Sequence, residues 1–259
     1  MQQPRNVNVQ WEWIGQGWEM INKQMGNWIL ITLVAGAVYF ISQLPFYIFG
    51  GLLEFASTRS NSNDGLSALV FGSSMIMRLL EMVVGWAALA LIYSGMYSAA
   101  LKQMRGGQIA VGDLFSGTQY YVQALIATVL IGIGTFIGIL LCIIPGLLVA
   151  GLVFFTYPLI VDRNLSAMDA IKASIDVTQQ NLFSFALFAI VCGLIVVLGA
   201  VACCVGLLVT FPLFIAIVTC AYRDCFGIDG MVSNESYTPP PPPDYGGYEP
   251  PPPPPSSWQ

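Results

Sequence analysis

Histidine is absent from this 259-residue chain, and charged residues make up only 9% of it. Histidine is the commonest general base and metal ligand in proteins, so its absence argues against conventional hydrolase chemistry. A soluble domain is nearer a quarter charged, and this chain has too few charges to cover a water-facing surface. It also has no basic cluster, so nucleic acid is not an expected partner. The composition predicts a non-enzymatic membrane protein.

Cysteine is present, but its spacing does not predict a site. Five of the six cysteines lie in apolar segments and none forms a CxxC pair, which argues against a disulfide framework or a zinc site. Adjacent Cys203 and Cys204 are the one candidate redox or soft-metal pair, although cysteine is also a small residue that is readily buried. We therefore expect no bound metal or cofactor.

Long uncharged stretches are abundant instead. About 20 apolar residues form a helix that crosses the roughly 30 Å of hydrocarbon in a bilayer. The pattern predicts an all-α membrane protein with six transmembrane helices, at residues 28–49, 82–101, 120–143, 146–162, 182–203 and 206–222. Turns are expected at Pro145-Gly146 between the third and fourth spans, and near Gly206 between the fifth and sixth.

The second span is ambiguous at its start. The apolar stretch 66–101 would form a helix of roughly 54 Å, longer than a bilayer needs, and Arg78 and Glu81 interrupt it. We expect residues 66–80 to project as an outer interfacial or hairpin segment. A re-entrant segment and a long second helix remain the alternatives.

Two polar segments have helical amphipathicity. In residues 1–27, Trp11, Ile14, Trp18, Ile21 and Met25 recur at steps of three and four, which predicts an interfacial helix. A second is predicted after Ser166-x-x-Asp169, which resembles a capping box. Its apolar face is expected to consist of Met168, Ile171 and Ile175.

These segments suggest an internal repeat. Residues 145–149 match residues 205–209 at an offset of 60, and Asp162-Arg163 lies near the register of Arg223-Asp224. The predicted unit is an interfacial amphipathic helix followed by a transmembrane hairpin, and three such units give six spans.

The distribution of lysine and arginine predicts the orientation, since these residues concentrate in cytoplasmic loops. Arg59 and Arg78 fall on one side of the predicted topology. The other side holds Arg5, Lys23, Lys102, Arg105, Arg163, Lys172 and Arg223. Both termini are therefore expected in the cytoplasm.

The segment 228–259 is rich in proline and has no apolar face. We expect it to be a disordered cytoplasmic tail with polyproline II character. Pro242, Pro243 and Tyr245 fit a PPxY motif of the kind that WW-type grooves recognise, so a protein partner for the tail is one expectation. A simple spacer is the alternative.

Few other residues suggest a site within the spans. Arg78 and Glu81 are a candidate ion pair at the membrane edge, either functional or merely anchoring. Gly134 and Gly138 form a GxxxG packing motif. Prolines at 145, 158 and 212 can interrupt helices, as in transporters with broken helices.

The arrangement resembles bacterial membrane proteins related to the membrane domain of glycerophosphodiester phosphodiesterases, a largely uncharacterised superfamily, over about residues 10–227. The expected location is therefore a bacterial cytoplasmic membrane. The residues that carry this resemblance are Gly95 to Gly107, ending in Met104-Arg105-Gly106-Gly107, then Asp113-Leu114-Phe115, residues 143–146, and Ala170 to Ser174. The resemblance implies a fold and a membrane location. It implies no activity, because the phosphodiesterase domain and its catalytic residues are not in this sequence.

Three functions follow from the sequence, in order of preference. The first is a non-enzymatic scaffold or accessory factor with a proline-rich interaction tail. The second is a transporter or channel for small solutes, although no span contains a central acid or base. The third is an intramembrane enzyme, which the lack of histidine disfavours most strongly.

Overall fold

A computed structural model describes residues 8–59, 64–141, 143–201 and 206–228, and every regular element in these ranges is helical. Six helical stretches in these ranges are long and apolar enough to cross a membrane. They are Met25–Phe55, Gly72–Met104, Asp113–Leu141, Gly146–Arg163, Ala167–Val201 and Leu207–Phe226. The all-α class and the six candidate spans predicted from the sequence are confirmed.

Helix α1 (Glu12–Lys23) packs across the last helix, α10 (Leu207–Phe226). Its buried face overlaps the predicted stripe only at Ile21: Trp13, Gly17 and Met20 are buried beside Ile21, while Trp11 and Trp18 are 52% and 45% exposed. The reason is close approach: a Cβ on Gly17 would lie 2.8 Å from Cγ1 of Ile217. Hydrophobic periodicity alone does not predict that a helix packs through the face that carries a glycine.

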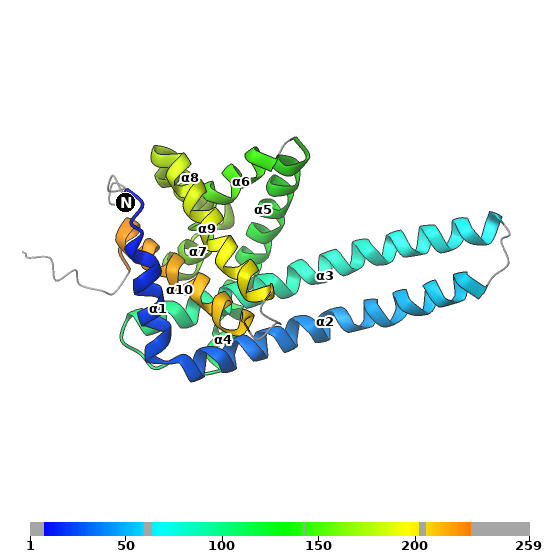
Figure 1. Cartoon of the computed structure of the whole chain (residues 1–259), viewed down its shortest axis with the longest axis horizontal. Coiled ribbons are helices and arrows are strands. Elements are labelled where there is room, and N and C mark those ends of the chain that lie inside the picture. The colour runs from blue at the N-terminus through cyan, green and yellow to red at the C-terminus, as the bar shows by residue number, and fades with distance from the viewer. Residues whose placement is uncertain (1–7, 60–63, 142, 202–205, 229–259) are drawn as a thin grey trace, which may run out of the picture.

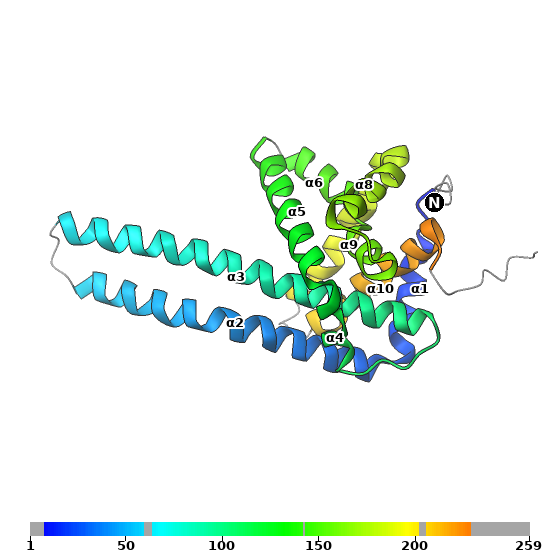
Figure 2. The ribbon, with the colours of Figure 1, turned by 180° about the vertical axis from the view of Figure 1, so that it is seen from behind.

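Helices α2 (Met25–Arg59) and α3 (Asp64–Met104) form a hairpin that projects far beyond the other helices (Figures 1 and 2). Their 35 and 41 residues make them roughly 52 and 62 Å long. The prediction that residues 66–80 form a separate outer segment is wrong, since they belong to one continuous α3. Arg78 and Glu81 do not interrupt the helix, because they pair with each other on one face of it.

A short turn of helix, α4 (Asp113–Ser116), and a 3₁₀ turn (Gly117–Tyr120) lead into α5 (Tyr121–Leu141), which is followed by α6 (Ile143–Leu152). The predicted turn at Pro145-Gly146 is therefore misplaced. These residues lie in the first turn of α6, where proline is tolerated because that N–H has no helical partner.

The predicted fourth span, 146–162, is not one helix. Helix α6 ends at Leu152 and α7 (Thr156–Arg163) begins after a turn. Ser174 donates to the Leu152 carbonyl at 2.7 Å and accepts from the Phe155 N–H at 3.1 Å, while Thr178 donates to the same carbonyl. The break is stable because α8 supplies the bonds that the helix lacks.

Helix α8 (Ala167–Thr178) begins at Ser166, whose hydroxyl accepts from the Asp169 N–H, as the capping-box pattern predicted. Its packed face consists of Ala170, Ser174 and Val177, while Met168, placed on the apolar face by the sequence, is half exposed. Small residues therefore make up much of the face that packs against the neighbouring helices.

Helix α8 continues through a 3₁₀ turn (Gln179–Asn181) into α9 (Leu182–Val201), and α10 starts after Gly206. Gly206, the predicted turn residue between the last two spans, directly precedes α10, and residues 202–205 lie outside the described residues. Cys203 and Cys204 lie outside the described residues. The three-unit repeat remains a prediction.

The core is built around α10, whose residues from Ile215 to Tyr222 are all buried. This helix contacts α1, α2, α3 and α9. The start of α1 and the end of α10 lie side by side, away from the far end of the α2–α3 hairpin (Figure 1).

Candidate functional site

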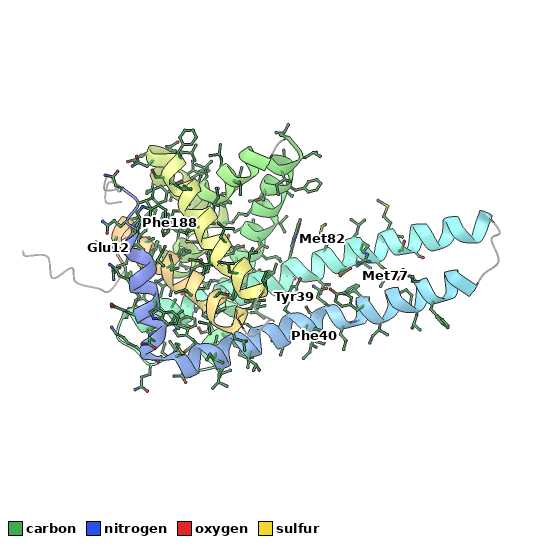
Figure 3. The ribbon with its side chains drawn as sticks, in the orientation of Figure 1. Glu12, Tyr39, Phe40, Met77, Met82 and Phe188 are labelled. Carbon is green, nitrogen blue, oxygen red and sulfur yellow. The ribbon has the colours of Figure 1, made fainter. Side chains whose placement is uncertain are left out.

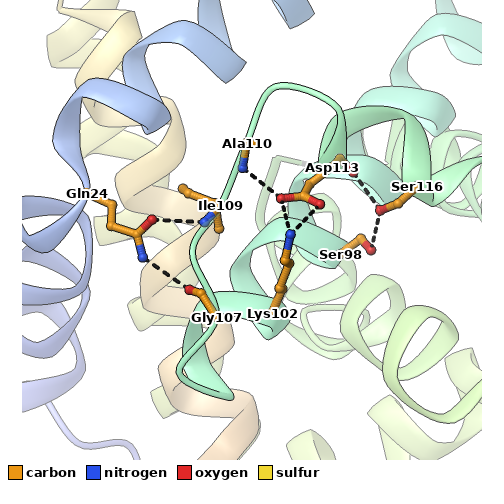
Figure 4. Close-up of polar contacts among 8 residues, drawn as sticks. All are labelled: Gln24, Ser98, Lys102, Gly107, Ile109, Ala110, Asp113 and Ser116. Atoms are coloured by element: carbon orange, nitrogen blue, oxygen red, sulfur yellow. Dashed lines mark hydrogen bonds and ion pairs between the residues drawn. The ribbon is translucent and has the colours of Figure 1, made fainter.

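Polar side chains gather where α3 ends and α4 begins (Figure 4). Lys102 donates to both carboxylate oxygens of Asp113 at 2.8 and 2.9 Å, and the Ala110 N–H donates to the same carboxylate at 2.7 Å. Ser98 and Ser116 are hydrogen-bonded at 2.8 Å. Asp113 thus closes the connection between α3 and α4.

Two glutamines attach this connection to the start of the chain. Gln24 accepts from the Ile109 N–H at 2.9 Å and donates to the Gly107 carbonyl at 3.2 Å (Figure 4). Buried Gln103 accepts from the Trp28 indole at 2.7 Å and donates to the Met20 carbonyl at 2.6 Å. Both glutamines use their donor and acceptor ends, so they connect α1, α2 and α3.

A buried carboxylate joins three further helices. The Asp162 side chain is 0% exposed, accepts from the Arg105 guanidinium at 2.5 Å, and accepts from the Tyr222 hydroxyl at 2.7 Å. The next residue, Arg163, donates to the Phe226 carbonyl at the end of α10 and lies over the Phe226 ring. A buried carboxylate is stable only with such partners.

The end of α10 is bound to α1 in the same way. Asp224 accepts from the Trp13 indole at 2.8 Å and from Arg223 at 2.7 Å. Arg223 also donates to Gln16 at 2.8 Å. Together with the contacts of Asp113, Gln24, Gln103 and Asp162, these bonds form what we call the polar junction.

The polar junction contains residues that carried the resemblance stated above, including Arg105, Gly106 and Asp113. Gly106 has φ of +85°, a backbone conformation that favours glycine. Nearby, Gly95 of α3 meets α4 so closely that a Cβ would overlap the Leu114 carbonyl. The sequence analysis missed the roles of Gln24 and Gln103. A polar residue at the end of an apolar stretch can indicate a hydrogen bond between helix ends.

The predicted pair of Arg78 and Glu81 forms at 3.1 Å on α3, far from the polar junction. Both residues line a cavity of about 270 Å³ between α2 and α3, which we call the α2–α3 groove. Gln43 also lines it and is 3% exposed, and its Oε1 atom is buried without a hydrogen-bond partner. Figure 3 shows Tyr39 and Met82, two other lining residues, where the hairpin leaves the other helices.

The predicted packing glycines differ in how closely they are approached. A Cβ on Gly134 would lie 3.7 Å from Val149, an ordinary contact, and Gly138 is buried. Closer approaches occur at the tips of the hairpins: a Cβ on Gly146 would lie 2.7 Å from Ile139, and one on Gly206 would overlap Gly199.

Among the residues that the structure describes, no three carboxylate, cysteine or histidine side chains are grouped so that they could hold a metal ion. Pro242, Pro243 and Tyr245 of the predicted tail motif lie outside these residues.

Comparison with known proteins places the chain near mycobacterial proteins of undetermined function. It is 28% identical over 173 residues to the uncharacterized protein Rv2560 of Mycobacterium tuberculosis strain H37Rv, and equally to the uncharacterized protein Mb2590 of Mycobacterium bovis. The match covers 67% of this chain and 53% of each relative, so the chain spans about half the length of the curated relatives it matches. No family model and no solved structure matches, so the resemblance to the phosphodiesterase membrane domain stays a prediction. The chain is a multi-pass membrane protein with distant mycobacterial homologues.

Proposed function

We propose that this protein is a non-enzymatic scaffold or accessory factor of the membrane, which presents residues 228–259 to a protein partner. The observation that carries the proposal is the polar junction. Its carboxylates and glutamines bind the ends of α1, α3, α7 and α10 to one another. Polar groups committed to interhelical bonds stabilise a rigid platform, and a platform is what a scaffold requires.

The proposed location is the bacterial cytoplasmic membrane, with both termini and the polar junction in the cytoplasm. The bias of lysine and arginine toward that side supports this orientation. Cysteines introduced one at a time into a cysteine-free variant test it. A cysteine at Asn61 should react with an impermeant reagent added outside whole cells, and cysteines at Lys102 and Asn164 should react only in opened cells. The reverse pattern would contradict the orientation.

Capture of a partner tests the scaffold function. The full chain, crosslinked in membranes and purified, should retain a protein that a chain ending at residue 230 does not. A chain with Tyr245→Ala in an intact tail distinguishes the PPxY motif from the proline runs, because only the motif needs this tyrosine. Identical protein sets from the full and shortened chains would rule out the tail as an interaction segment.

A transporter or channel for small solutes is the second candidate. The break between α6 and α7 favours it, because interrupted membrane helices commonly surround substrate and ion sites. Solute flux into liposomes that contain the purified chain separates the two functions. Flux above that of protein-free liposomes would support transport, whereas the scaffold function predicts none.

A further inference from the structure

The α2–α3 groove has an unusual composition for the wall of a membrane helix. Its polar residues are Tyr39 and Gln43 of α2 and Arg78 and Glu81 of α3, and Met82 and Trp86 complete much of the lining. A cavity of about 270 Å³ has room for roughly nine waters, the size of a lipid headgroup. The groove therefore suits a small polar group with an apolar extension.

The lining changes from charged to apolar along α3. Counting from Lys102 at 1.5 Å per residue, Leu89 lies about 20 Å along the helix and Arg78 about 36 Å. Since the hydrocarbon layer is about 30 Å thick, Arg78 and Glu81 reach the far interface while Leu89 and Trp86 remain in hydrocarbon. The lining is therefore polar at the interface and apolar toward the middle of the membrane, as a membrane lipid is.

Gln43 places an unpaired amide oxygen in the wall of the groove. Its side chain is 3% exposed, and its Oε1 atom has no hydrogen-bond partner. Gly85 makes the space for this amide, because a Cβ there would lie 2.8 Å from the Gln43 Nε2 atom. A buried acceptor without a donor is destabilising, so a ligand that supplies an N–H group would stabilise the site.

We propose that the α2–α3 groove binds a phospholipid whose headgroup contains a primary ammonium. The lipid phosphate accepts from the Arg78 guanidinium, which has five N–H donors and gives only part of them to Glu81. The ammonium donates to the Glu81 carboxylate and to Gln43 Oε1, once the Gln43 amide turns to present this buried oxygen to the groove. The start of an acyl chain lies along Met82 and Trp86.

The charges that line the groove select this headgroup over others. A headgroup with only negative charge would face the Glu81 carboxylate, which is unfavourable. A quaternary ammonium balances the charges but has no N–H for Gln43. The site is independent of the tail, so its test does not depend on the proposed scaffold function.

Native mass spectrometry of the purified full chain in detergent tests the proposal. Phosphatidylethanolamine should remain bound about tenfold more tightly than phosphatidylcholine or phosphatidylglycerol, because one hydrogen bond to a charged group is gained. Soluble glycerophosphoethanolamine and inorganic phosphate serve as further probes, and both should bind more weakly because they have no acyl chain. Equal retention of the three lipids would overturn the proposal, as would tight binding of inorganic phosphate alone.

Substitutions locate the site. Gln43→Met should abolish the preference over phosphatidylcholine while keeping the preference over phosphatidylglycerol. The melting temperature without added lipid should stay unchanged or rise, since the substitution removes the unpaired acceptor. Ser42→Ala is the control and should keep both preferences, because the Ser42 hydroxyl is exposed and donates to the Tyr39 carbonyl of its own helix. Glu81→Gln provides an independent test, because it removes the negative charge that disfavours an anionic headgroup, and it should abolish the preference over phosphatidylglycerol. A preference over phosphatidylcholine retained in a folded Gln43→Met protein, or one over phosphatidylglycerol retained in a folded Glu81→Gln protein, would refute the site.

Discussion

The polar junction and the α2–α3 hairpin show two ways in which helices of one chain are held. At the junction, side chains far apart in the sequence meet, as Trp13 and Asp224 do. Along the hairpin, the Arg78–Glu81 ion pair lies within one helix, and Arg78 is 78% exposed. Large apolar residues on the outer hairpin, such as Leu52 and Ile76, are also exposed. Substitutions at the polar junction should therefore lower the free energy of unfolding more than substitutions on the outer hairpin.

The largest expected effect is at the close contact of α3 with α4. Gly95→Leu should prevent native packing, since even a Cβ would overlap the Leu114 carbonyl and backbone cannot move as a side chain can. We expect a loss of more than about 4 kcal/mol, visible as loss of a cooperative melt in detergent. Gly36→Leu is the matched control, because nothing lies within 4 Å of a Cβ there. An equal loss of stability in Gly95→Leu and Gly36→Leu would contradict the expectation that the contact of α3 with α4 is more sensitive than an open position on the hairpin.

A smaller loss is expected for the buried carboxylate of the junction. Asp162→Ala leaves Tyr222 without its acceptor and Arg105 without its ion pair, and should lower stability by about 2 kcal/mol. Arg105 is partly exposed, so water compensates for part of this loss. Asp176→Ala, at an exposed position of α8, should change the melting temperature little. If the two alanine variants melt alike, Asp162 does not stabilise the junction.

The break in the fourth span should be sensitive to one hydroxyl. Ser174→Ala removes the acceptor of the buried Phe155 N–H and one of two donors to Leu152, so we expect a loss of about 1–2 kcal/mol. Faster backbone amide exchange at Phe155 should accompany it, because the turn opens more readily. Ser184→Ala on the exposed side of α9 provides the comparison and should alter neither measurement. Unchanged exchange at Phe155 would mean that Ser174 is not needed at the break.

The smallest effect is expected on the hairpin. Arg78→Gln removes an exposed ion pair within one helix, which contributes less than about 1 kcal/mol. Thermal unfolding in lipid-free detergent should show only a slight shift, reduced further at high salt. A loss as large as that of Asp162→Ala would mean that the hairpin stabilises the fold as much as the junction does.

Local properties of the sequence were sufficient for several parts of this structure. Uncharged stretches of sufficient length predict six candidate spans, because hydrocarbon imposes a minimum length on any crossing helix. The cap at Ser166 was also predictable, since a cap depends only on residues three positions apart. The pairing of Arg78 with Glu81 follows from the same spacing.

Long-range packing decided the remainder. The continuous α3 and the early start of α6 at Ile143 depend on packing against other helices, which a polarity pattern does not show. The break before Thr156 exists because Ser174, distant in sequence, supplies its hydrogen bonds. The buried face of α8 consists mostly of small residues, and that of α1 is centred on Gly17, where Ile217 approaches closely.

The sequence by itself determined the class of this protein, the number of candidate spans and the local caps. Each of these depends on the free energy of one short segment in water or lipid. Only the tertiary structure decided that Asp162 meets Tyr222, that Gln103 meets Trp28, and that Gln43 is buried beside Gly85. These contacts join residues tens of positions apart, and their energies exist only once the helices have packed.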